Sequence, residues 1–106
     1  MRAFILLYNG PPTPRNTTHE GWPEWFDGAG DRLLDMGSPM LNAFVVRADG
    51  SISDNAAPLN GFSIVAAEDR DEAVGLIRNH PFLALGSDYT VEAFEVPMRA
   101  TAEETA

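Results

Sequence analysis

The stretch Asn60–Val96, NGFSIVAAEDRDEAVGLIRNHPFLALGSDYTVEAFEV, decides the fold. Its apolar run at 61–67 is short and bounded by turn residues, which predicts a strand. Asp69, followed three residues later by a glutamate, fits a capping box and predicts a helix that runs to about Asn79. A further strand is expected at 89–96. The stretch therefore encodes one complete βαβ unit.

The first half of the chain shows the same pattern. Arg2 to Tyr8 is a continuous apolar run, which predicts a strand covered on both faces. Thr17 and Glu20 fit a second capping box, and apolar residues at helical spacing predict a helix that continues to the Gly37-Ser38-Pro39 stop. Three aspartates recur every fourth residue along this helix and predict one solvated acidic stripe: Asp27, Asp31 and Asp35.

The centre of the chain completes the topology. We expect a strand at 42–47, a tight turn at Asp49-Gly50 and a loop over 52–59. The order βαββαβ predicts an α+β fold of the ferredoxin-like kind, a four-stranded antiparallel sheet with two helices on one face. Its first and third strands are central, and its second and fourth strands are edges. The domain is expected to span residues 1–98, with a flexible polar C-terminal tail at 99–106.

The helices of such a fold cover only one face of the sheet. Because the first strand is apolar on both faces, the other face needs a partner, and the simplest partner is a second copy of the chain. The sequence therefore predicts a homodimer.

Composition excludes several classes of function. The formal net charge is −9, and all seven basic residues are arginines scattered along the chain, so binding to nucleic acid or to an anionic membrane is not expected. The absence of cysteine excludes disulfides and thiolate catalysis. The first residues show neither a signal-peptide pattern nor a membrane span, so we expect a cytoplasmic protein.

Several short motifs occur in a characteristic order: F-I-L-L-Y, W-P-E-W, L-L-D-M-G-S-P-M, A-P-L-N-G-F-S-I-V-A-A, D-R-D-E-A-V-G-L-I, H-P-F-L and V-E-A-F-E-V. With them the chain resembles the YCII-related (YciI-like) family of dimeric α/β-barrel proteins over residues 1 to about 98. The resemblance implies two ferredoxin-like subunits whose sheets face each other, each with a small pocket between sheet and helices. It also implies a His–Asp pair in some relatives and dehydrochlorination of ring substrates in one branch. Here His19 matches that pair in part, and no aspartate follows the Gly37-Ser38-Pro39 turn.

His80 is the strongest single candidate for chemistry. A histidine at a helix C-terminus has its charged form favoured by the helix dipole, and it can move a proton near neutral pH. The alternative is that His80 only caps the helix before Pro81. His19 is expected to be solvated. Because the two histidines are far apart and lack an acidic residue at ligand spacing, neither a metal nor another cofactor is expected.

Four further residues are candidates for ligand binding. Trp22 and Trp25 lie three residues apart and can either line an aromatic pocket or pack in the core. Tyr8 ends the first strand, where its phenol can hydrogen-bond a ligand or reach water. Asn60 can hold a ligand amide or an oxyanion, although an Asn-Gly turn is the simpler interpretation.

The preferred function is a dimeric small-molecule-binding protein, a non-catalytic binding or accessory module for a small aromatic or carboxylic ligand. One alternative is an enzyme of the lyase, isomerase or dehydrohalogenase type with His80 as proton carrier. Another, based on fold analogy alone, is a cofactor-free monooxygenase acting on phenols. The enzyme hypothesis requires His80 to lie within hydrogen-bond reach of the pocket.

Overall fold

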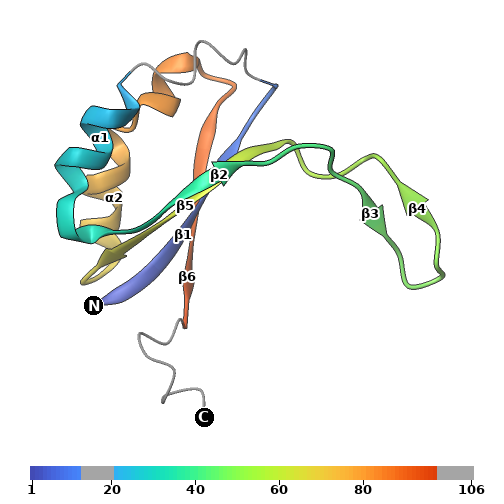
Figure 1. Ribbon diagram of the computed structural model, residues 1–106, viewed down its shortest axis with the longest axis horizontal. Helices are drawn as coiled ribbons and strands as arrows, with labels where there is room; N and C mark the ends of the chain where they lie inside the picture. Colours follow the sequence, from blue (N-terminus) through green and yellow to red (C-terminus); the bar gives the residue numbers. More distant parts are fainter. Residues whose placement is uncertain (13–20, 98–106) are drawn as a thin grey trace.

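The computed structural model describes residues 1–12 and 21–97 of the chain, and Figure 1 shows how they are arranged. Within these ranges the elements are β1 (Arg2–Asn9), α1 (Trp22–Ala29), the 3-10 helix η1 (Gly30–Arg32), β2 (Leu33–Pro39), β3 (Val45–Val46), β4 (Ile52–Ser53), β5 (Leu59–Ala67), α2 (Arg70–Arg78), the 3-10 helix η2 (Pro81–Leu85) and β6 (Thr90–Val96).

The long strands form one antiparallel sheet in the order β2-β5-β1-β6. β1 and β5 are central, as predicted, and β2 and β6 are the edges. Both α-helices lie on the same side of this sheet (Figure 1). The structure confirms an α+β protein with a four-stranded antiparallel sheet and two helices, and it is compatible with a ferredoxin-like fold.

The side chains of β1 alternate between the two faces of the sheet. Phe4, Leu6 and Tyr8 are buried and belong to the core formed with α2 and η2. Ile5 and Leu7 point to the other face, where they are only half-buried. We call this second face the open face, because neither α1 nor α2 covers it (Figure 1).

The first helix is much shorter than predicted. α1 ends at Ala29, where Gly30 adopts a φ of 55°, a left-handed conformation that glycine enters without strain. The chain then forms η1 and the edge strand β2, so the prediction of a helix up to Gly37 is wrong. The predicted acidic stripe is wrong as well, because Asp35 lies in β2 and its carboxylate accepts a hydrogen bond of 2.7 Å from the Gly37 N–H.

The predicted strand at 42–47 belongs to a projecting hairpin instead of the main sheet. β3 pairs with β4 in a separate two-stranded ladder. The predicted turn at Asp49-Gly50 joins them, with a φ of 87° at Gly50, whereas the predicted loop at 52–59 is interrupted by β4. We call residues 40–58 the arm. Figure 1 shows the arm leaving the sheet between β2 and β5, on the side away from α1 and α2.

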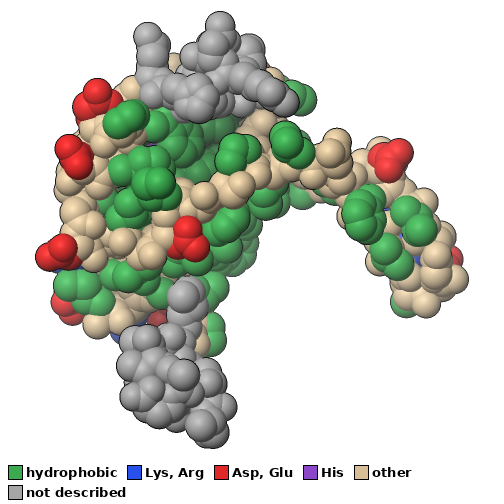
Figure 2. Space-filling model, in the orientation of Figure 1, with side chains coloured by type: hydrophobic (Ala, Val, Ile, Leu, Met, Phe, Trp, Pro, Cys, Tyr) green, Lys and Arg blue, Asp and Glu red, His purple; other side chains and the backbone are tan. Residues whose placement is uncertain are grey.

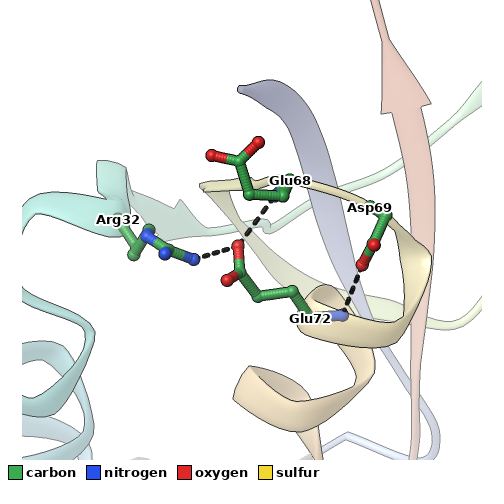
Figure 3. A network of polar contacts seen from close by, with 4 residues as sticks. All are labelled: Arg32, Glu68, Asp69 and Glu72. Carbon is green, nitrogen blue, oxygen red and sulfur yellow. Dashed lines mark hydrogen bonds and ion pairs between the residues drawn. The ribbon is translucent and has the colours of Figure 1, made fainter.

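The second helix begins with the predicted capping residues. The Asp69 carboxylate accepts a hydrogen bond of 3.0 Å from the Glu72 N–H, and the Glu72 carboxylate accepts one of 2.7 Å from the Glu68 N–H (Figure 3). The Glu72 carboxylate also forms an ion pair with Arg32 of η1. Its pKa is lowered, chiefly by the hydrogen bond from Arg32. This network ties the end of the α1–η1 segment to the start of α2.

Three sequence predictions fall on residues that the structure does not describe, namely the capping box at Thr17 and Glu20, the solvated His19 and the tail at 99–106. α1 itself begins directly after Gly21, which has a φ of 79° and supplies no side-chain cap. Pro23 lies in the first turn, where a backbone N–H has no acceptor within the helix. The N–H that proline lacks is therefore not missed at this position.

Candidate functional site

Four of the five predicted site residues lie together at one end of the core. Tyr8 is near the end of β1, Trp22 and Trp25 lie on the first turn of α1, and His80 directly precedes η2. The His80 ring centroid is 4.8 Å from that of Tyr8. The corresponding distances to the rings of Trp22 and Trp25 are 4.7 and 4.2 Å. The imidazole is therefore enclosed by aromatic rings from two elements that are distant in sequence.

A chain of hydrogen bonds runs through this cluster. The Phe82 N–H donates to Nδ1 of His80 over 3.0 Å, which leaves the ring proton on Nε2. Nε2 lies 3.0 Å from the Tyr8 hydroxyl and donates to it. The Tyr8 hydroxyl donates to Ser63 Oγ over 2.6 Å, and Ser63 donates to the Met36 carbonyl over 2.8 Å. We call this series the Tyr8 chain; it links η2, β1, β5 and β2.

Burial decides the charge state of the titratable groups in the Tyr8 chain. His80 and Tyr8 are each only 2% exposed. Burial lowers the pKa of the His80 imidazole from 6.5 to about 4. Burial also raises the pKa of the Tyr8 phenol to about 12, against the smaller opposing effect of its hydrogen bond to Ser63. Both groups are therefore neutral near pH 7. Burial therefore favours the neutral form of His80, whereas the sequence led us to expect that the helix dipole would favour its charged form.

His80 caps the start of η2 through its side chain, and its backbone N–H donates to the Ile77 carbonyl over 2.8 Å. The Nδ1 lone pair is occupied by the Phe82 N–H, and the Nε2 proton is directed at Tyr8. A general base needs a free lone pair beside its substrate. In this arrangement neither ring nitrogen offers one.

The two tryptophans are half-buried and pack against the core from α1. Trp22 meets Tyr8 edge-on, with ring centroids 5.0 Å apart. The Trp25 indole N–H donates to the Leu76 carbonyl over 2.9 Å, which fixes the ring against α2. Their role in packing is therefore established, and Trp25 alone of the pair also lines an open groove.

Asn60 lies apart from the aromatic cluster. It is the second residue of β5, so the Asn-Gly turn considered from the sequence is wrong. Its side-chain amide donates to the Gly10 and Pro11 carbonyls, both over 3.2 Å. Asn60 thus holds the end of β1 to β5 and does not share a site with His80.

A groove of about 440 Å³ lies between the two helices, and we call it the α1–α2 groove. Trp25, Leu76 and Pro81 supply apolar lining, and Glu24 and Asn79 supply polar lining. Within the part of the chain that the structure describes, Glu24 is the single charged residue that lines it. The groove therefore combines an aromatic ring with negative charge, a combination that favours flat neutral or cationic molecules over anions.

Two helical glycines also line the α1–α2 groove. A Cβ atom built on Gly28 or on Gly75 meets no neighbouring atom within 4 Å. A glycine inside a helix costs about 1 kcal/mol relative to alanine. No close contact within the described residues requires either glycine, so both leave free space in the groove.

Sequence reasoning missed Ser63, which is fully buried at 0% exposure and completes the Tyr8 chain. The available signal was a lone hydroxyl in the otherwise apolar run at 61–67, because a buried hydroxyl needs a partner. It also missed Gly75, an isolated glycine within a helical pattern. His19 lies outside the described residues.

Within residues 1–12 and 21–97 no three histidine or acidic side chains gather as a set of metal ligands. None of the helices formed there has both the length and the apolar character needed to span a bilayer.

Comparison of the chain with models of protein families, with curated proteins and with solved structures gave no match. The YCII-like resemblance stays a prediction from the sequence motifs.

Proposed function

We propose that this chain is the subunit of a YCII-like homodimeric protein that binds a small molecule without transforming it. The ligand would be a flat aromatic compound, neutral or cationic, held in the α1–α2 groove. In the assembled protein two ferredoxin-like subunits would bring their open faces together as a dimeric α/β barrel, as the family resemblance implies.

The observation that carries this proposal is the free space that Gly28 and Gly75 leave in the α1–α2 groove. Alanine at either position would favour the helix by up to about 1 kcal/mol. A glycine at these positions lets a ligand approach the helix backbone closely, because the methyl group of an alanine would occupy part of the ligand's site. The Trp25 ring beside this space supplies an apolar surface for a planar molecule.

Charge narrows the ligand class. The sequence left open an aromatic or a carboxylic ligand, but Glu24 lines the groove and, among residues 1–12 and 21–97, no basic residue does. The net charge of −9 on the whole chain acts in the same direction. A carboxylate ligand would meet repulsion, whereas an aromatic ligand with a protonated aliphatic amine would gain attraction from Glu24 and from the face of Trp25.

The Tyr8 chain favours binding over catalysis. A lyase, isomerase or dehydrohalogenase needs a group that accepts a proton from its substrate. His80 is the only histidine in the described ranges, and both of its ring nitrogens are hydrogen-bonded within the core. His80 is also absent from the lining of the α1–α2 groove. The enzyme alternatives therefore lack their proposed proton carrier in this geometry.

A thermal-shift screen with arylalkylamines, phenols, quinones and aromatic carboxylic acids tests the proposal. A ligand at 100 times its dissociation constant adds about 2.7 kcal/mol to the stability of the folded state. We expect amines and neutral phenols to raise the melting temperature and carboxylic acids to have little effect.

In the same screen, Gly75→Ala tests whether the ligand binds in the α1–α2 groove. The variant should melt at a higher temperature than the wild type without ligand, and it should lose most of the ligand-induced shift. Asp27→Ala is the matched control, because Asp27 is an exposed residue of α1 that does not line the groove. A full ligand-induced shift in Gly75→Ala would refute binding in the groove, and a preference for carboxylic acids would refute the charge argument.

A further inference from the structure

The arm displays an apolar surface that the rest of the described chain, residues 1–12 and 21–97, leaves uncovered. Four of its large apolar side chains are each more than 60% exposed: Leu41 at 72%, Phe44 at 65%, Val46 at 61% and Ile52 at 70%. Figure 2 shows hydrophobic side chains gathered on the arm, at the right of the view. β3 and β4 contribute only two residues each, and an isolated hairpin of this size is marginally stable in water. The arm therefore needs a surface to pack against.

A second uncovered apolar surface is the open face of the sheet. Phe94 of β6 pairs with Ile5, and Ile5 pairs with Ile64 of β5, so these three side chains share one face. Phe94 is 53% exposed, and Ile5 and Ile64 are half-buried. Leu7 continues the same surface along β1. The open face thus carries apolar side chains on three of its four strands, β5, β1 and β6.

The two surfaces lie on the same side of the molecule. The arm leaves the sheet away from α1 and α2 and bends, so that it and the sheet border a concave space (Figures 1 and 2). The arm does not fill this space, as the exposure of its apolar side chains and of Phe94 shows. The space therefore remains available to another molecule.

We infer that the arm of one copy packs against the part of a second copy's open face that the sheet-to-sheet contact leaves uncovered, and that the partner's arm does the same in return. This inference rests on the homodimer proposed above and adds to it a specific part for residues 40–58. A two-fold axis satisfies both surfaces at once, because each copy presents one arm and one open face. A different partner protein would have to supply its own matching pair of surfaces.

The apolar area is sufficient for such a pair. The four arm side chains and Phe94, at roughly 100 Å² each, supply on the order of 500 Å² in each copy and about 1,000 Å² in the dimer. This reaches the lower limit for a specific interface before any polar rim is counted. Arg47 of the arm can pair across the interface with Glu92, an exposed carboxylate beside Leu7 on the open face, while the other two charged residues of the arm, Asp49 and Asp54, would have to stay at the solvated rim.

Sedimentation velocity over a range of concentrations tests the inference. The wild type should be a dimer, and the double variant Phe44→Ser/Ile52→Ser should raise the dimer dissociation constant at least tenfold. The matched control is Asp27→Ser/Arg78→Ser, two exposed positions on α1 and α2 that should leave the constant unchanged. A monomeric wild type would overturn both the homodimer and the role of the arm. A dimeric wild type with an unaffected double variant would overturn the arm contact alone.

Cross-linking gives a second test that does not depend on weakening the dimer. The chain contains no cysteine, so Phe44→Cys and Phe94→Cys each introduce a unique thiol. Mixing the two variants with a short bis-maleimide should give a covalent dimer that joins one copy of each. If one chain carrying both substitutions forms only an internal cross-link, the arm contacts its own sheet and the inference fails. Both tests are made without ligand, so their outcome is independent of the ligand screen.

Discussion

Replacing His80 by a residue that does not titrate should abolish most of the loss of folding stability between pH 7 and pH 5. The imidazole is 2% exposed and its pKa is lowered by burial to about 4. In the unfolded chain the same group has a pKa near 6.5. Between these two values the unfolded state binds more protons than the folded state, so stability rises with pH across this window. The stability contribution is fully present above pH 6.5 and is lost as the pH falls towards 4.

The size of the effect follows from the two pKa values. Linkage gives a loss of about 2 kcal/mol between pH 7 and pH 5, and of roughly 3 kcal/mol once the pH is below 4. For a domain of this length, about 2 kcal/mol corresponds to a decrease of roughly 8 °C in melting temperature. The geometry agrees with the sign of the shift, because a proton added to Nδ1 would face the Phe82 N–H that now donates to it.

Urea unfolding at a series of pH values, followed by tryptophan fluorescence, measures this loss in the wild type and in His80→Gln. His80→Gln should be less stable than the wild type at pH 7, because it disturbs the ring packing, but its stability should change little between pH 7 and pH 5. His19→Gln controls for the second histidine of the chain and should retain the wild-type slope. An equal loss of stability in the wild type and in His80→Gln would refute the assignment of the pH dependence to the buried imidazole.

Two further substitutions, each compared with a control substitution, test the local structure by urea unfolding. Gly37→Ala should cost about 3 kcal/mol or more, because its Cβ would lie 1.6 Å from the Phe62 carbonyl oxygen at a φ of 81°. Gly50→Ala, with a φ of 87° and open space around it, should lose only about 1–2 kcal/mol, and equal losses would contradict the steric argument. Asp69→Ala should cost about 1 kcal/mol through loss of the α2 cap. Asp71→Ala, which removes no cap, should cost less, and the reverse order would contradict the capping role.

Four elements could be predicted because their local signals agree with their place in the fold. β1 and the core of β5 are apolar runs that become central strands, and α2 has a capping residue at Asp69 and a stop at Pro81. β6 closes the sheet where the sequence placed it. The prediction failed between Ala29 and Arg47. Leu33 and Met36 continue the helical spacing of α1, and local periodicity has no means of showing that Gly30 adopts a positive φ.

The edge strand β2 was missed for a related reason. Its sequence, LLDMGSP, contains no β-branched residue and includes a glycine and a proline, so its own propensity for a strand is weak. Pairing with β5 holds it in the sheet, at the cost of register shifts on either side of Asp35. Such tertiary pairing is absent from the local pattern.

The candidate site was predictable only in part. The sequence indicated three aromatic residues and one histidine as candidates for a site. The structure brings these residues, Tyr8, Trp22, Trp25 and His80, together. Their hydrogen bonds depend on register between distant strands, which places Ser63 opposite Leu6 and within reach of Tyr8.

The hydrogen bonds of the Tyr8 chain can all point in one direction only, because the chain starts at a backbone N–H in η2, which must donate, and ends at a backbone carbonyl in β2, which must accept. The Nε2 proton of His80 is shielded from water and should exchange slowly enough to give its own NMR signal. Any loosening of β2 would free the Ser63 hydroxyl to turn, and the change would pass through Tyr8 to the imidazole. Since β2 leads directly into the arm, a single resonance from the core would report, without any label, what happens at the far edge of the sheet.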